Sequence, residues 1–174
     1  MKKNEWKKFW KAILSSIYGL VTVAAVSILI STLWLPILHV YGSSMSPTLM
    51  DGEYLVAMKN SDFRCGDVIA LYYGNKLLVK RCIAGPGQWV SIDEEGNVYV
   101  DEKLIDEPYL KEKSLGNCDI EFPYQVPEDS YFVMGDNRAV SLDSRTALMG
   151  SVVKEQIVGR VVFCIWPLKE WGRR

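Results

Sequence analysis

The sequence predicts a mainly β protein in which a single N-terminal transmembrane helix precedes an antiparallel β-sheet domain. Three observations support this fold class. No formally charged side chain lies between Lys11 and Asp51. Short segments rich in Val, Ile and Tyr follow, separated by Gly, Pro, Asn and Asp. The total of 174 residues leaves room for one folded domain after the apolar run. We therefore expect a basic segment at residues 1–11, an anchor helix at 12–38 and a β-rich domain at 39–174.

The N-terminal segment is strongly basic, with a single acid, Glu5, among its first eleven residues. Its lysines are Lys2, Lys3, Lys7, Lys8 and Lys11. Because short basic flanks stay in the cytoplasm, we expect the N-terminus inside the cell and the β domain outside the cell membrane. The net charge of the chain is -1, so the remainder is acidic on balance, which argues against nucleic acid as a partner.

The apolar run is long enough to cross a lipid bilayer, since a core of roughly 30 Å needs about 20 apolar helical residues. A cleavable signal sequence is shorter and ends in a small-x-small site. Here Trp34, Leu35 and Pro36 stand where small residues would be needed. We therefore expect a single-pass, uncleaved anchor whose exit end is marked by Trp34 and Pro36. His39, the only histidine, could be a catalytic base or metal ligand, but we favour a polar residue where the helix leaves the bilayer.

The domain after the anchor has the pattern of an antiparallel β fold. Its candidate strands are "EYLVAM", "DVIALYY", "KLLVKRCIAG", "QWVSI", "NVYV", "YFVMG" and "QIVGRVVFCIW". The segment at 91–105 predicts a hairpin that turns near residues 95–97. The polar, Pro-bearing segment at 106–129 is interpreted as a long surface loop.

Four cysteines, Cys65, Cys82, Cys118 and Cys164, lack a close pair with metal-ligand spacing, so zinc is not expected. Outside the cell they could form two disulfides in any of three connectivities. Cys82 and Cys164 lie inside apolar segments typical of buried strands. We therefore expect free thiols.

Two adjacent serines, Ser43 and Ser44, follow the anchor in a turn that contains Met and Pro. A serine hydroxyl is a weak nucleophile until a base removes its proton. A lysine can be that base only when neutral, which requires a pKa shift worth about 4 kcal/mol, and burial supplies such a shift. Lys80 in "LLVKRCIAG" is the best candidate, because strand alternation puts Leu78 and Cys82 on its own face. The alternative is a strand-end lysine whose amine reaches solvent.

A third polar element, "VMGDNRAVSLDSR" at residues 133–145, interleaves two acids with two arginines. It is either a solvated charged loop or a loop fixed by bidentate carboxylate and guanidinium pairs. In the second case it could hold Ser141 rigidly.

These elements together resemble a known family. "GSSMSPTL", "GDVI", "VKRCIAGPGQ" and "GDNRAVSLDSR" are similar to the four consecutive sequence boxes of bacterial type I signal peptidase, in the compact single-span form of Gram-positive bacteria. The resemblance covers nearly the whole chain. It implies that Ser44 is the nucleophile, Lys80 the general base and Ser141 the residue that orients the lysine, with no metal or cofactor.

The resemblance also assigns supporting residues. It places Met45 against the catalytic pair, and it gives a bracing role to Asp136, Arg138, Asp143 and Arg145. Some members have a serine at the position of Gly42 whose hydroxyl helps to bind the oxyanion. With glycine there, the oxyanion must rely on backbone N–H groups, that of Ser44 among them, and Ser43 is expected to be structural.

The implied function is removal of signal peptides from exported preproteins, after small residues at the -1 and -3 positions, through an acyl-enzyme. Ser44 lies within roughly 20 Å of the end of the apolar run, which suits a cleavage site at the membrane surface. The anchor argues against soluble self-cleaving repressor proteases, and a sortase-like enzyme would need a histidine in the folded domain. A membrane-anchored binding module without catalysis remains an alternative. The sequence does not specify an oligomeric state.

Overall fold

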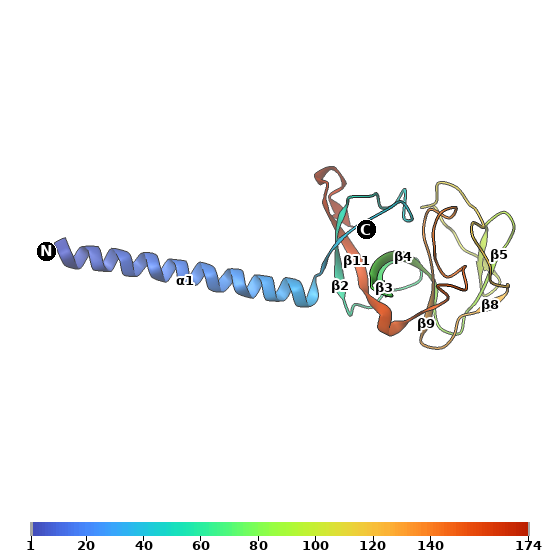
Figure 1. Ribbon diagram of the computed structural model, residues 1–174, viewed down its shortest axis with the longest axis horizontal. Coiled ribbons are helices and arrows are strands. Elements are labelled where there is room, and N and C mark those ends of the chain that lie inside the picture. Colours follow the sequence, from blue (N-terminus) through green and yellow to red (C-terminus); the bar gives the residue numbers. More distant parts are fainter. Residues whose placement is uncertain (1, 174) are drawn as a thin grey trace. The chain divides into compact units, whose positions relative to one another are not determined.

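The computed structural model describes residues 2–173 and contains two compact units, one ending at Pro36 and one beginning at Ile37 (Figure 1). The first is a single long helix. The second, called the β unit below, begins at Ile37 and contains all of the strands found among residues 2–173. This arrangement confirms the predicted class of an apolar N-terminal helix followed by antiparallel sheets.

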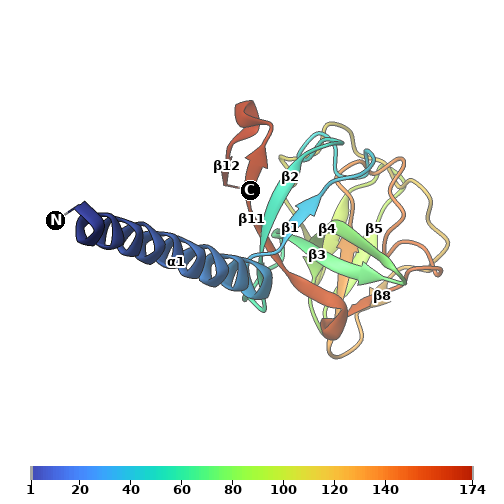
Figure 2. The same ribbon diagram turned by 60° about the vertical axis from the view of Figure 1, so that its left-hand side comes forward.

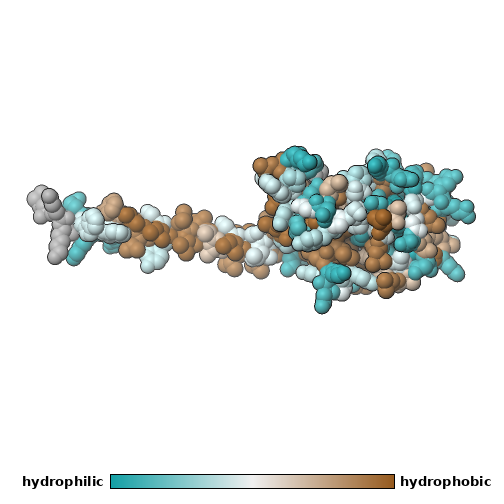
Figure 3. Space-filling model, turned by 45° about the horizontal axis from the view of Figure 1, so that its top comes forward, coloured by the Kyte–Doolittle hydropathy of each residue, from teal (hydrophilic) through white to brown (hydrophobic). Residues whose placement is uncertain are grey.

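Helix α1 (Lys2–Trp34) is long and apolar enough over Glu5–Trp34 to cross a membrane, and hydrophobic side chains cover much of its length (Figure 3). Three of its hydroxyls, those of Ser16, Thr22 and Thr32, bond back to carbonyls of the preceding turn, as in Thr22 Oγ1 to the Tyr18 carbonyl at 2.8 Å. The helix differs from the predicted 12–38 at both ends. It stops at Trp34 because Pro36 lacks an N–H and disfavours a helical residue before it. Residues 37–38 belong to a strand, while the membrane boundaries themselves stay a prediction.

The strands of the β unit are short and antiparallel. They are β1 (Ile37–His39), β2 (Tyr54–Lys59), β3 (Val68–Tyr73), β4 (Lys76–Ala84), β5 (Trp89–Ile92), β6 (Val98–Val100), β7 (Lys103–Leu104), β8 (Tyr124–Gln125), β9 (Ser130–Met134), β10 (Val152–Val153), β11 (Ile157–Trp166) and β12 (Gly172–Arg173). Two short 3-10 helices, η1 (Lys154–Gln156) and η2 (Leu168–Glu170), flank β11.

The strands form two sheets (Figure 2). The larger has the order β1-β2-β11-β3-β4-β9-β10, with β12 also paired to β11. The smaller has the order β7-β6-β5-β8. Strand β4 connects the β3 side of the larger sheet to its β9 side. The first half of β4 pairs only with β3, whereas its last residues also pair with β9.

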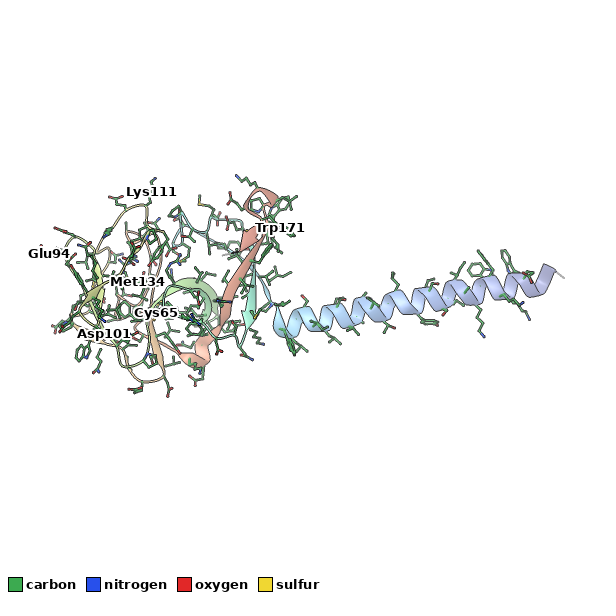
Figure 4. All side chains as sticks on the ribbon, turned by 180° about the vertical axis from the view of Figure 1, so that it is seen from behind. Cys65, Glu94, Asp101, Lys111, Met134 and Trp171 are labelled. Atoms are coloured by element: carbon green, nitrogen blue, oxygen red, sulfur yellow. The ribbon has the colours of Figure 1, made fainter. Side chains whose placement is uncertain are left out.

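The core of the β unit lies in three clusters. The first joins β1, β2, β3 and β11 through side chains such as Leu55 and Val161. The second packs β4 and β9 against the smaller sheet, with Phe132 and Val90 fully buried. Met134, which lies in the interior in Figure 4, belongs to this second cluster. The third joins β3, β4, β9 and β10, so β4 contributes to two clusters and is fixed on both sides.

Two sequence predictions about local structure can now be compared with the molecule. The hairpin is confirmed, since β5 and β6 pair with Ser91 opposite Tyr99 and turn at residues 93–97. The interpretation of 106–129 as a surface loop is wrong in part. Val126 is buried, and partly buried side chains of this segment pack on the second cluster: Leu115, Ile120, Phe122 and Tyr124. The segment is irregular but forms one wall of the core.

Candidate active site

Ser44 lies in a turn that leaves β1. The turn begins at Gly42, whose φ of +83° suits glycine and whose N–H donates to Asp51 Oδ1 at 2.7 Å. Met45 is buried in the first cluster and anchors the turn there. Ser44 is half-buried, whereas Ser43 is exposed. The local structure therefore presents one serine to the interior and leaves the other in solvent.

Lys80 is buried in β4, with 3% of its surface exposed, so its amine does not reach solvent. Its Nζ donates a hydrogen bond to Ser141 Oγ at 2.9 Å. Burial lowers the pKa of Lys80 from its ordinary 10.5 to about 8. The neighbouring charges oppose one another, because Asp143 and Asp136 raise this pKa and Arg145 lowers it.

Gly135, directly after β9, lies between the two serines of the site. A Cβ built at this glycine would clash with Ser141 Oγ and would lie 2.5 Å from the Ser44 carbonyl oxygen. The same carbonyl accepts a hydrogen bond from the Asn137 N–H at 3.0 Å. The turn of Ser44 and the loop of Ser141 thus pack against the same small residue, with Lys80 bonded to the latter. Among residues 2–173 the Ser44 hydroxyl itself has no hydrogen-bond partner.

The charged loop at 133–145 is fixed by buried ion pairs, as the second interpretation of its sequence supposed. Arg145 forms a bidentate pair with Asp143, with both N–O distances at 2.8 Å, and Asp143 Oδ2 also accepts the Gly135 N–H at 3.0 Å. Arg138 donates through Nε to the Gly135 carbonyl. The peptide groups on both sides of Gly135 are therefore held by buried charged side chains.

Two of the pairs cross the loop to partners that sequence reasoning missed. Asp136 pairs with Arg81 of β4, at 2.8 and 2.6 Å, and Arg138 pairs with the buried carboxylate of Glu107. Tyr109 stacks on Arg81 and donates through its hydroxyl to Glu107. One signal could have suggested a missing acid. The boxes "VKRCIAGPGQ" and "GDNRAVSLDSR" together hold three arginines but only two aspartates, and buried guanidinium groups need partners.

The other sequence candidates lie as follows. His39 is in β1, stacked on Tyr54 with ring centroids 4.4 Å apart, so it belongs to the sheet and not to the helix end. All four cysteines are free thiols, with Cys82 and Cys164 buried. Among residues 2–173 no group of three or more His, Cys, Asp or Glu side chains is arranged to hold a metal ion.

A cavity of about 630 Å³ runs up to Ser44. One wall is β1 with the residues that follow it, and the other is the first half of β4. The lining residues are Ile37, Leu38, His39, Val40, Tyr41, Gly42, Ser44, Met45, Lys76, Leu77, Leu78 and Val79. Each wall presents a free strand edge, because β1 ends the larger sheet and β4 pairs with β9 only from Arg81 onward. The groove is thus open to an extended chain.

Comparisons with known proteins show which family the chain resembles. A family model described as signal peptidase, peptidase S26, matches residues 12–166. The chain is 35% identical to a signal peptidase I of Bacillus amyloliquefaciens, over 97% of each chain. It is 33% identical to signal peptidase I U of Bacillus subtilis strain 168, over 88% of each. A solved signal peptidase I from Enterococcus faecalis V583 matches with 27% identity and a TM-score of 0.49, over 57% of this chain and 97% of that one.

Proposed function

The chain belongs to the signal peptidase family, peptidase S26, and we propose that it cleaves exported preproteins with a Ser44 and Lys80 dyad after small residues at the -1 and -3 positions. Membership of the family makes it a serine endopeptidase that removes signal peptides. The alternative of a binding module without catalysis does not fit that membership. The observation that carries the dyad is the buried amine of Lys80, held on Ser141 beside the turn of Ser44.

Substrate recognition follows from the two free strand edges of the groove. An extended peptide can pair with β1 or β4 through main-chain hydrogen bonds, which give affinity without regard to side-chain identity. Selectivity then comes from the walls. Val40 and Met45 are buried and Val79 is partly buried where the groove approaches Ser44. These apolar side chains line the groove beside Ser44, and we infer that they leave room there only for small residues of the substrate.

The dyad works by proton transfer. Neutral Lys80 removes the proton of the Ser44 hydroxyl as its oxygen attacks the scissile carbonyl, and the amine returns that proton to the leaving nitrogen. The resulting acyl-enzyme is hydrolysed by a water that Lys80 activates in the same way. Ser141 keeps the amine in place between these steps. Contacts between nucleophile and base are often loose before substrate binds, so the free Ser44 hydroxyl suits this role.

The oxyanion requires N–H donors near Ser44. Gly42 cannot supply one, because its N–H already donates to Asp51. The Ser44 N–H has no acceptor among residues 2–173. We assign it as a donor to the oxyanion.

The location in the cell is part of the same proposal. The lysines before α1 favour a cytoplasmic N-terminus, so the β unit would lie outside the cell membrane. Helix α1 would span the lipid bilayer once. Holding the enzyme and the signal peptide in one membrane raises their effective concentration.

The test is cleavage of a purified preprotein by the full chain in detergent, comparing the parent with Ser44→Ala, Ser43→Ala and Lys80→Met. We expect Ser44→Ala and Lys80→Met to lose cleavage, at least 1,000-fold by the order of magnitude usual for a missing nucleophile or base. Ser43→Ala, the adjacent exposed serine, is the matched control and should cleave at the same bond as the parent. Cleavage by Lys80→Met at the parent rate would refute the dyad, and cleavage by Ser44→Ala would refute the nucleophile.

A further inference from the structure

One irregular segment contacts all three buried arginines of the site. Residues 107–116, called the strap below, begin with the Glu107 carboxylate paired with Arg138. The ring of Tyr109 then covers Arg81, with its centroid 3.7 Å from the guanidinium carbon. At the far end the Leu115 carbonyl accepts from Arg145 Nη1 at 2.6 Å. The middle of the strap, by contrast, is exposed, and Lys111 points away from the unit (Figure 4).

The strap ends in close contact with the loop that it covers. Gly116 has a φ of +60°, and a Cβ there would clash with the Arg138 carbonyl oxygen and lie 2.8 Å from Arg145 Nη1. Only glycine allows both the backbone conformation and this approach. The contacts of Glu107, Tyr109 and Leu115 therefore each fall on a guanidinium group whose other side faces a carboxylate or carbonyl of the charged loop at 133–145.

We propose that Tyr109 is a positioning residue, whose ring holds Arg81 on Asp136 and thereby fixes the loop that carries the reacting groups. The inference rests on the proposed Ser44 and Lys80 dyad. A cation over an aromatic face is attracted to it, and the ring also excludes water from the ion pair beneath. The Tyr109 hydroxyl bonds the same carboxylate oxygen of Glu107 that Arg138 contacts, so the ring is itself held in place.

The path from Tyr109 to the base is short and made of contacts already described. Asp136 follows Gly135 directly, and Gly135 separates the Ser44 carbonyl from the Ser141 hydroxyl. Lys80 is bonded to that hydroxyl. Loosening Arg81 would let this loop shift and admit water to the amine.

The charged groups that face Lys80 are Asp136, Asp143 and Arg145. Water that reaches the amine weakens the desolvation that keeps it neutral, and an Asp136 less neutralised by Arg81 attracts its proton more strongly. Both changes favour the protonated amine. Loss of the ring should therefore move the acidic limb of the pH profile to higher pH.

The experiment measures the pH profile of kcat/KM for preprotein cleavage by the full chain in detergent. Tyr109→Leu removes the ring, whereas Tyr109→Phe keeps it and loses only the hydroxyl. Tyr99→Leu is the matched control, since Tyr99 is also half-buried and also bonds a carboxylate, that of Asp93, but lies in the smaller sheet. If Tyr109→Leu does not fold, Tyr109→Met fills similar space without a ring.

We expect Tyr109→Leu to shift the acidic limb upward by about half a pH unit or more and to lower kcat at pH 7.4 about tenfold with little change in KM, the effect of a displaced catalytic group. Tyr109→Phe and Tyr99→Leu should keep the limb of the parent. The proposal is overturned if the limb of Tyr109→Leu stays in place, or if Tyr109→Phe shifts as far as Tyr109→Leu. Lys80→Met in the same series separates the two questions, because cleavage by that variant would refute the dyad whatever Tyr109 does.

Discussion

The pH dependence of cleavage can be worked out from the surroundings of Lys80. Its pKa of about 8, against an ordinary 10.5, corresponds to about 3 kcal/mol at about 1.4 kcal/mol for each pH unit. At pH 7.4 about one amine in five is neutral, compared with roughly one in 1,000 for an ordinary lysine. Burial thus makes the base over a hundred times more abundant, by the same order-of-magnitude reckoning.

The assay is kcat/KM for a peptide that contains a signal peptide cleavage site, measured with the full chain from pH 5.5 to 10.5. We expect kcat/KM to rise about tenfold for each pH unit and to level off near pH 8, since only the neutral amine accepts the proton. Added salt should move this limb little, because desolvation and not an exposed charge is the largest cause of the shift. A rise that continues beyond pH 10 would mean that the amine is solvated. A flat profile between pH 6 and 9 would mean that another group is the base.

Three further outcomes follow from the same structure. Lys80→Met should raise the free energy of unfolding at pH 7 by about 2 kcal/mol. Removing the buried, protonated amine stabilises the fold by about 3 kcal/mol, and losing its hydrogen bond to Ser141 costs about 1 kcal/mol. The pKa of Lys80 is lower in the folded than in the unfolded state, so the free energy of unfolding of the parent rises from pH 8 to 10.5. In urea titrations the difference between Lys80→Met and the parent should therefore close over this range, and a constant difference would contradict this prediction. Gly135→Ala should lower kcat/KM about 100-fold, whereas Gly172→Ala, where a Cβ meets open space, should not; equal activities would exclude the close contact. A hydrogen bond from a neighbouring buried thiol lowers the pKa of Cys65 to about 7. Iodoacetamide should therefore modify Cys65 before the other cysteines, and its labelling rate, followed by mass spectrometry, should reach half of its maximum near pH 7. Faster labelling of any other cysteine would refute this assignment.

Some features were predictable because they leave a local pattern. Alternation along β4 predicted that Lys80 faces an apolar side, and the structure buries it there. The hairpin of β5 and β6 was predictable from two apolar runs around a short polar turn. The apolar length of α1 predicted a span, and Trp34 and Pro36 marked the region where the helix ends, although the predicted anchor segment 12–38 runs on into β1.

The strap was not predictable in this way. Glu107 lies 31 residues from its partner Arg138, and a buried ion pair imposes no period on the sequence around it. A segment with exposed charges such as Lys111 and Glu112 therefore has the composition of a solvated loop even though Glu107 at its start is buried. Likewise, only the folded topology shows that β1 and β4, four places apart in the larger sheet, line one groove.

The two unpaired edges of the groove carry a risk that is separate from catalysis. An open strand edge can recruit the edge of another folded molecule and begin aggregation. Two features of this groove limit that outcome. Strand β1 has only three residues, and β4 begins at a lysine, whose charge resists burial against a second sheet. Pairing with a long strand of another folded molecule is thus disfavoured, whereas a short peptide segment can still bind. The shortness of β1 therefore limits aggregation at this edge and also favours rapid release of the cleaved substrate.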